Sequence, residues 1–300
     1  DIATTTNYFG AVNNVIVGVG DKLTVRIDTI GVHEYEVSVY NYHRTWIIIG
    51  TIALFLITLV VIGGKQGFKA VVGLIFTILC IVFILVPLCL KGYSSVLITC
   101  LVILITNIAC YALIGGIQIK TVTACMGSMC GVLVAAILAY LAQQLTGLTT
   151  FQMDEAEALL LVKAEYPLQM RGLFISGILI ASMGAVMDIA MDIASSLDEL
   201  HKHKPELTSR ELFKSGMNIG RDAMGTMANT LVLAFAGTSL NMMILIYSYG
   251  VSFNQLINTD FVAIEIIRAV AGSMGIVLTV PFVAAISAGA YHRKKETKRN

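Results

Sequence analysis

The chain is poor in charge, in proline and in tryptophan. Charged residues make up only 13% of its 300 residues, and it has four prolines and one tryptophan. About a quarter of the residues in a soluble domain are charged, so this composition excludes an ordinary soluble protein. Because 57% of the residues are hydrophobic, we predict an all-α polytopic membrane protein that has the lipid bilayer as a partner.

Several familiar functional motifs are also missing. All six cysteines lie in apolar stretches and none has C-x-x-C spacing, so we interpret them as small buried residues rather than as disulfides or metal ligands. No nucleic-acid-binding motif is present. We expect no cofactor and no nucleic-acid partner, and the sequence specifies no particular metal.

Residues 1–45 contain the only β-type pattern. Leu23, Val25 and Ile27 alternate with polar residues, as in a half-buried strand. A segment this short buries little core by itself, so we interpret it as the end of a larger extracytoplasmic β-rich domain. Because the chain begins with Asp1 rather than Met, we expect an upstream segment to precede it.

From Trp46 onward the sequence divides into apolar runs of about 18 to 28 residues, each long enough to cross a bilayer as a helix. We predict about seven transmembrane helices in residues 46–291, followed by a basic cytoplasmic tail at residues 292–300. The predicted spans are Trp46–Gly63, Ala70–Leu90, Ser94–Ile114, Thr121–Leu145, Gly172–Ser196, Ala223–Tyr247 and Ile264–Tyr291.

Two connections between the predicted spans contain structure of their own. The acidic loop from Thr146 to Arg171 includes a short apolar helix, which we interpret as a surface helix, with a lid or gate as the alternative. In the basic loop that follows the fifth span, Thr208 and Glu211 form a capping-box pattern. This pattern predicts a new helix that runs into the sixth span. Near the start of the last span, Glu265 and Arg268 are spaced to pair.

Two carboxylates mark the fifth span as a candidate functional element. Asp188 and Asp192 are one helical turn apart, and Ser195 continues the same face. A carboxylate at membrane depth is costly and normally faces a bundle interior or a water-filled cavity, so it is a functional-site hypothesis. The alternative is that both residues lie at the water boundary and only terminate the helix.

A second polar face lies on the helix that enters the sixth span. Asn218, Asp222 and Asn229 share this face, with Arg221 and Thr226 beside it. We predict that it meets the polar face of the fifth span and forms an oxygen-rich site for a small cation or a proton, with Arg221 as the counter-charge. The alternative is interface packing near the lipid headgroups. The predicted site residues are Asp188, Asp192, Ser195, Asn218, Arg221, Asp222, Thr226 and Asn229.

Three glycines on the same helix allow another backbone to approach closely, as in membrane helices that pack without a hydrophobic driving force. We therefore expect either a homo-oligomer or a complex with a related membrane subunit. The glycines are Gly216, Gly220 and Gly225.

These polar segments resemble the YibE/YibF-like family of bacterial multi-pass membrane proteins. The resemblance runs from about Trp46 to the C-terminus and is densest over residues 180–240. It implies a location in the bacterial cell membrane, and the β segment looks like the end of the extracytoplasmic domain of YibE-type members. The resemblance carries no catalytic residue to this chain. The segments that carry it are Met187–Ser196, Gly216–Asp222 and Gly225–Leu231.

Three functions are compatible with the sequence. The first is a transporter or permease component with an ion-coupled or proton-coupled carboxylate site. The second is a non-catalytic membrane subunit that assembles with a related protein. The third is an intramembrane aspartyl protease, which is disfavoured because none of the predicted spans contains the Gly-x-Gly-Asp pattern. An enzymatic activity is thus the less favoured reading.

The basic residues are distributed unevenly between alternate loops. Cytoplasmic loops are enriched in Lys and Arg. If the β segment is outside, and its own Lys22, Arg26 and Arg44 are left out of the count, 13 basic residues fall on the inner side and four on the outer side. The outer residues are Lys91, Lys163, Arg171 and Arg268. The inner residues are Lys65, Lys69, Lys120, Lys202, Lys204, Arg210, Lys214, Arg221, Arg293, Lys294, Lys295, Lys298 and Arg299.

We therefore predict that the N-terminal segment is outside and the C-terminus is cytoplasmic. In a cysteine-free background, cysteines placed at Lys202 and Lys294 should react with a membrane-impermeant thiol reagent only after permeabilisation, whereas a cysteine at Asp21 should react in intact cells. Labelling of all three positions from the same side would contradict this orientation.

Overall fold

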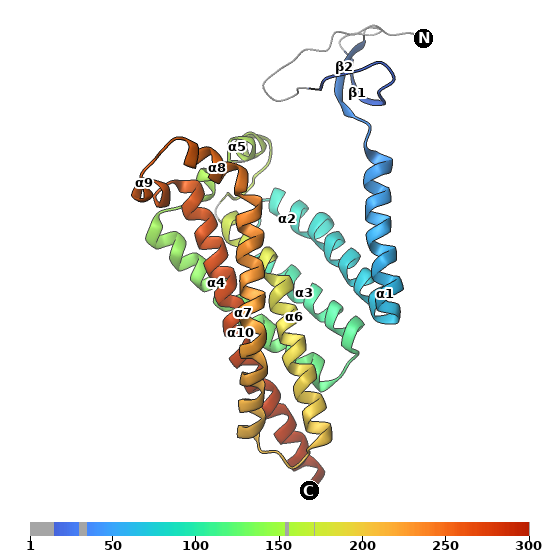
Figure 1. Ribbon diagram of the computed structural model, residues 1–300, viewed down its shortest axis with the longest axis vertical. Helices are drawn as coiled ribbons and strands as arrows, with labels where there is room; N and C mark the ends of the chain where they lie inside the picture. Colours follow the sequence, from blue (N-terminus) through green and yellow to red (C-terminus); the bar gives the residue numbers. More distant parts are fainter. Residues whose placement is uncertain (1–14, 30–34, 154–155, 171, 300) are drawn as a thin grey trace. The chain divides into compact units, whose positions relative to one another are not determined.

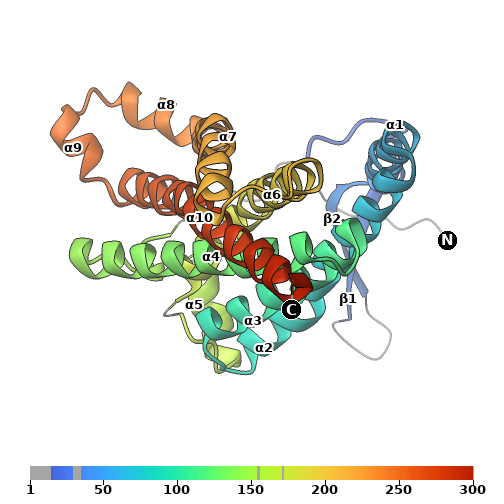
Figure 2. The ribbon, with the colours of Figure 1, turned by 90° about the horizontal axis from the view of Figure 1, so that it is seen from below.

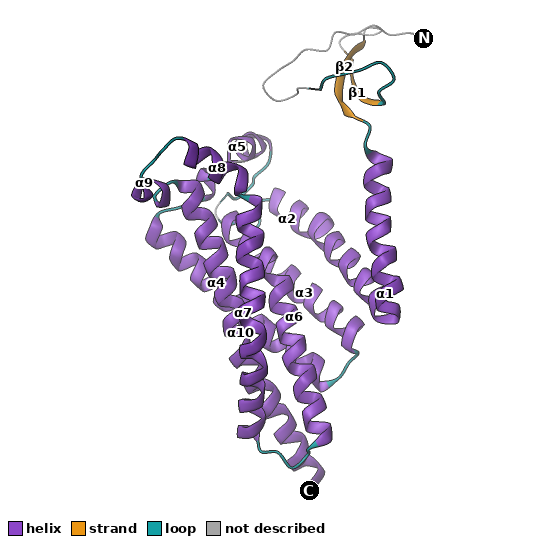
Figure 3. Ribbon diagram, in the orientation of Figure 1, coloured by secondary structure: helices purple, strands orange, loops and turns teal. Residues whose placement is uncertain are grey.

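The fold is almost entirely helical, with one small sheet near the N-terminus (Figure 1, Figure 3). The structure is a computed structural model, which describes residues 15–29, 35–153, 156–170 and 172–299. Three charged residues of the long acidic loop, Asp154, Glu155 and Arg171, lie outside the described residues. The chain divides into two units, Asp1–Val71 and Val72–Asn300.

The first unit contains the predicted β segment. Strand β1, Leu23–Thr29, pairs antiparallel with strand β2, Tyr35–Tyr42. Val25 pairs with Val39 and Ile27 with Val37, so the β-branched residues of the alternating pattern lie opposite each other. A register irregularity between Thr24 and Val25 interrupts the ladder. Two strands alone bury little surface, since Ile27 is still 61% exposed.

The first two predicted spans belong to one helical element. Helix α1, Thr45–Cys80, continues through a π-helical turn, η1 (Ile81–Leu85), into α2, Val86–Leu90. The loop predicted at residues 64–69 is absent, because Gly64 alone departs from helical geometry, at φ 54° and ψ −131°. Glycine tolerates this conformation because it has no Cβ. The chain bends back sharply there, with Gly67 packed against the backbone of Leu59.

The number of spans is therefore smaller than predicted. Among the described residues, five helical elements are long and apolar enough to cross a membrane, or six if one bent pair is counted as a single span. The bent pair joins α7, Ser209–Thr238, to α8, Leu240–Ser248, at an angle of 59°. The prediction of seven spans is wrong, because the first two predicted spans belong to one helical element, Thr45–Leu90.

The second unit is organised around helix α10, Asp260–Arg299. Figure 2 shows α10 crossing the middle of the bundle, between α4 (Ile119–Thr146), α6 (Leu173–His203) and α7. Helix α3, Ser95–Gly115, packs against α4 and α6. A single apolar core runs through these helices and includes Ile189 and Ile193 of α6 and Val280 of α10, which are fully buried.

Small residues bring α4 and α10 into close contact. A Cβ added to Gly127 would lie 2.9 Å from the Cα of Val283, and one added to Gly131 would lie 3.0 Å from the carbonyl oxygen of Gly275. These distances leave no room for a side chain, so the two backbones touch. The same principle holds for α7, where a Cβ at Gly216 would lie 2.9 Å from the Cβ of Ala284.

The long acidic loop lies at the end of the bundle where α4 ends and α6 begins (Figure 1). It contains a 3₁₀ turn, η2 (Thr150–Gln152), and the predicted short helix, α5 (Ala156–Glu165). Leu159 and Val162 pack on a small cluster with Leu168 and Met170, whereas Leu161 is 74% exposed. Helix α5 thus rests on the bundle by one edge, as a surface helix does. A further short helix, α9 (Phe253–Ile257), connects α8 to α10.

The predicted helix start at Thr208 is confirmed. The Thr208 hydroxyl accepts a hydrogen bond from the Glu211 backbone N–H at 3.3 Å, and the Glu211 carboxylate accepts one from the Thr208 N–H at 2.8 Å. This reciprocal pair satisfies two backbone donors that have no partner within the helix.

Replacing Gly127 with alanine should destabilise the bundle by about 1–3 kcal/mol, because the added methyl group would overlap the Val283 backbone. Gly184→Ala is the matched control, since a Cβ there meets nothing within 4 Å. The control should be neutral or stabilising by up to about 1 kcal/mol, because alanine favours a helix interior. Thermal unfolding of the purified variants measures both effects. Equal stability of the two variants would argue against close packing of α4 and α10.

Candidate functional site

Asp188 and Asp192 lie together on the outward side of α6. Ile189, Ala190 and Ile193 of the same helix are fully buried, and both carboxylates are exposed in the single chain. This alternation follows from the helical repeat, which puts residues four apart on one face. The structure therefore brings these two predicted site residues together.

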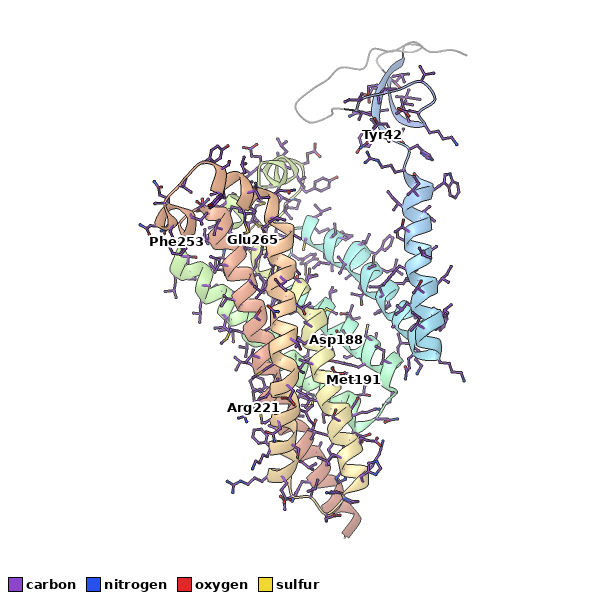
Figure 4. All side chains as sticks on the ribbon, viewed as in Figure 1. Tyr42, Asp188, Met191, Arg221, Phe253 and Glu265 are labelled. Carbon is purple, nitrogen blue, oxygen red and sulfur yellow. The ribbon has the colours of Figure 1, made fainter. Side chains whose placement is uncertain are left out.

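The carboxylates open into a groove between three helices. A cavity of about 330 Å³ is lined by side chains of α3, α6 and α7, and Figure 4 labels Asp188 and Met191 on α6. Apart from the two carboxylates and a phenol, the lining is apolar and rich in methionine. The lining residues are Tyr111, Ile114, Met187, Asp188, Met191, Asp192 and Met227.

Tyr111 is a groove residue that the sequence reasoning missed. Its side chain is 1% exposed, and its hydroxyl donates a hydrogen bond to the Met187 carbonyl oxygen at 3.1 Å. The phenol thus joins α3 to α6 one residue before Asp188. The available signal was a tyrosine inside an apolar span, four residues after Asn107 and twelve after Thr99.

The second polar face does not reach the groove. Asn218, Asp222 and Asn229 are exposed on α7, and they lie on the side opposite to Gly216 and Gly220, which are the residues buried in the bundle. The prediction of two meeting polar faces therefore does not describe the single chain. The two polar faces do not meet because the glycine side of α7 is turned toward α6 and α10, and the side with Asn218, Asp222 and Asn229 is not.

The remaining predicted site residues on α6 and α7 occupy intermediate or exposed positions. Ser195 is half-buried, and Arg221 and Thr226 are exposed. The Thr226 hydroxyl donates to the Ala223 carbonyl oxygen at 2.8 Å, within its own helix. Among the described residues, no ion pair joins Arg221 to Asp188 or Asp192, so Arg221 is not their counter-charge within one chain.

The α6–α7 register still brings the two faces to the same depth. The Gly216 position packs against Leu197, and the Gly220 position packs against Ile193. Continuing this antiparallel register places Asp192 at the level of Arg221. The two sets of polar residues are therefore level with each other on neighbouring helices, but they face different directions.

A second polar cluster lies near the far end of α6. The Tyr291 hydroxyl donates to Asp198 Oδ1 at 2.9 Å, and Lys202 Nζ lies 2.7 Å from Asp198 Oδ2. His201 stacks on the Tyr291 ring with centroids 4.8 Å apart. The Tyr291–Asp198 bond and the His201–Tyr291 stack connect α6 to α10. Asp198 and Lys202 also line a cavity of about 850 Å³. The four-residue spacing of Asp198 and Lys202 was a usable signal in the sequence.

The predicted pair near the start of α10 is confirmed. Arg268 Nη1 lies 2.6 Å from Glu265 Oε1, and both side chains are largely buried. The Arg268 guanidinium also lies 5.9 Å from the centre of the Phe174 ring, a cation–π geometry. The contact with Phe174 joins the start of α10 to the start of α6, well away from the carboxylate groove.

The three carboxylates that the sequence grouped do not form a cluster. Among the described residues, no three His, Cys, Asp or Glu side chains are placed together as potential metal ligands. The candidate site is therefore a pair, Asp188 and Asp192, in a mostly apolar groove.

A family model described as YibE/F-like protein matches residues 51–293. The chain belongs to this family. The match includes every helix that lines the groove and leaves the two-stranded sheet outside it. No curated protein and no solved structure matches the chain. Membership in the YibE/F-like family thus agrees with the resemblance carried by residues 180–240 and assigns no activity.

Tyr291→Phe should destabilise this YibE/F-like bundle by about 1–3 kcal/mol, because it removes a hydrogen bond to the partly buried Asp198 carboxylate. Tyr140→Phe is the control, since Tyr140 is 52% exposed. Thermal unfolding of both variants in the same detergent provides the comparison. If Tyr291→Phe unfolded at the parental temperature, the Tyr291–Asp198 hydrogen bond would contribute nothing to stability.

Proposed function

We propose that the protein is a component of a membrane transporter in which Asp188 and Asp192 hold a transported or coupling cation. The observation that carries this proposal is the position of Asp188 at the middle of α6. It lies about 15 residues from each end of Leu173–His203, or about 22 Å along the helix axis. The hydrocarbon core of a bilayer is about 30 Å thick, so a carboxylate at this point would lie inside the core of a bilayer that α6 crosses symmetrically.

This position disfavours a boundary role for the carboxylates. The sequence alone placed the end of the fifth span at Ser196, which made Asp188 and Asp192 residues of a helix end. Helix α6 continues to His203, and its last turns contain Asp198 and Lys202, which are better suited to the water interface. A charged pair at mid-helix is expensive and is expected to have a functional ligand.

The chemistry of the groove suits a small cation. Two carboxylates one turn apart repel each other, and a bound proton or cation removes that repulsion. Carboxylate oxygens are also ligands for hard cations, whereas the neighbouring thioethers are not. The apolar methionine walls lower the local dielectric and strengthen the attraction between the pair and a cation.

The polar face of α7 supports a second candidate, a membrane subunit that assembles with another chain. Asn218, Asp222 and Asn229 point away from the core, and lipid contact at this depth would leave their polar groups unsatisfied. A second copy or a related subunit would cover them, and Gly225, which has nothing within 4 Å of its Cβ position, would allow close approach. Assembly and transport are compatible functions.

An aspartyl protease fits this arrangement less well. Such an enzyme needs two carboxylates on opposite sides of a catalytic water, whereas Asp188 and Asp192 share one helix and Asp222 faces away from them. We place the transporter in the bacterial cell membrane, with the β segment outside and the C-terminus cytoplasmic, because of the uneven distribution of basic residues.

Asp188→Asn and Asp192→Asn should abolish cation flux, because each removes a charge and keeps the size and hydrogen-bonding capacity of the side chain. The measurement uses proteoliposomes that contain the purified chain, with proton, sodium, potassium and magnesium gradients tested in turn. Glu199→Gln is the control, since it removes one negative charge from an exposed position of the same helix.

Parental flux in monodisperse Asp188→Asn and Asp192→Asn variants would refute the cation site. Absence of flux from the parental chain under every gradient would favour the assembly candidate, because a subunit that needs a partner does not transport alone.

A further inference from the structure

We propose that α3 carries a hydrated internal path for protons, which joins the Asp188–Asp192 groove to the pocket at the opposite end of the bundle. This inference rests on the proposed cation site and identifies its cation as the proton. Its starting observation is a set of buried polar atoms, on α3 and on the facing helix α6, that have no hydrogen-bond partner among the described residues. They are Thr99 Oγ1, Asn107 Oδ1 and Ser176 Oγ.

Asn107 is the clearest member of this set. Its side chain is 1% exposed, and its Nδ2 donates to Ser128 Oγ of α4 at 3.4 Å and contacts Met129 Sδ at 3.6 Å. Its Oδ1 has no partner among the described residues. Reversing the amide would exchange the two atoms and still leave one of them unpaired. Buried polar groups are nearly always hydrogen-bonded, so an exception points to a bound water.

Thr99 and Ser176 form a second buried site with unpaired polar atoms, nearer the end of α3 that is farther from the groove. Contacts between α3 and α6 join Val96 to Gly172 and Tyr111 to Met187, residues whose numbers differ by 76. Thr99 and Ser176 differ by 77, so they lie at the same level on these two helices. Both are buried, at 0% and 5% exposure. A hydroxyl inside a helix ordinarily donates to a carbonyl of the preceding turn, and these two do not.

The polar groups of α3 recur at multiples of four residues and are all buried, in a row that winds gradually about the helix. Ser95 Oγ donates to the Gln169 carbonyl oxygen at 3.4 Å, beside a pocket of about 660 Å³ lined by Gln143, Gln144 and Gln169. Thr99 lies one turn further along, and Asn107 and Tyr111 follow at helical spacing. Tyr111 lines the groove with Asp188. The apolar residue Ile103, which is 1% exposed, lies between Thr99 and Asn107, the two residues of α3 that have unpaired polar atoms.

The neighbouring Thr106 shows that burial alone does not produce an orphan group. It is fully buried, and its hydroxyl donates to the Val102 carbonyl oxygen at 2.8 Å. The helix can therefore satisfy a hydroxyl internally at this depth. Asn107, one residue later and one helical turn before Tyr111, is left with an unpaired oxygen.

Proton transfer along such a row requires no other reactant. Each water or hydroxyl oxygen accepts one proton from the preceding oxygen and releases one to the next. The row returns to its original composition. One O–H bond forms on the Asp188 carboxylate, and one O–H bond breaks in a hydronium ion at the far pocket, which becomes water. A water bound at Asn107 supplies the oxygen that passes the proton on, because the Asn107 side chain has no hydroxyl group.

Asn107→Leu tests the path, because it removes the amide and keeps the side-chain volume. The full chain in lipid nanodiscs is subjected to a rapid drop in pH, and infrared difference spectroscopy follows the carboxylic acid band of Asp188, which is assigned by its loss in Asp188→Asn. The variant should slow protonation by about tenfold or more and leave the titration midpoint unchanged. Thr106→Val, with the same burial and no orphan atom, should keep the parental rate.

Two results separate this inference from the proposed function. A parental rate in Asn107→Leu, with the Asp188 band intact, would overturn the path and leave the cation site standing. Absence of an Asp188 band in the parental chain would overturn proton binding at the groove and the path with it. If Asn107→Leu does not fold, Ser128→Ala serves in its place, because it removes the bonding partner of the amide, and the same two results decide.

Discussion

The close approach of α10 to its neighbours is the contact on which the rest of the bundle depends. In an apolar solvent helices gain nothing from burying hydrophobic surface against each other, so backbone contact and van der Waals packing hold them together. Gly127 and Gly131 of α4 supply this contact on one side, and Gly216 and Gly220 of α7 supply it on the other. Helix α10 is thus fixed between two glycine faces.

This packing determines which side of α7 faces outward. The helix has a glycine side and a side with amides and a carboxylate, and only the glycine side is narrow enough to contact Val280 and Ala284 of α10. Asn218 and Asp222 are consequently directed away from the core. The polar side of α7 is therefore a result of packing, and its exposure is the strongest reason to expect a second chain.

The sequence predicts the helical class, the β segment and most helix positions well, because apolar length and capping patterns are local signals. The Thr208–Glu211 cap and the Glu265–Arg268 pair are correct for this reason. The sequence does not predict how a helix is rotated about its axis. Asn218 was grouped with Asp188 because both faces were polar, although rotation is set by the glycines. The span count failed at Gly64, where one residue replaces a loop.

The methionines of the groove give the carboxylate pair an adaptable surrounding. Met187, Met191 and Met227 line it together with Asp188 and Asp192, and unbranched thioethers adjust to irregular shapes better than branched side chains do. They are also open to chemical change, because oxidation converts a thioether into a polar, chiral sulfoxide. A sulfoxide beside the carboxylates would offer an oxygen where the reduced side chain offers none. The polarity of this groove therefore depends on the oxidation state of its methionines.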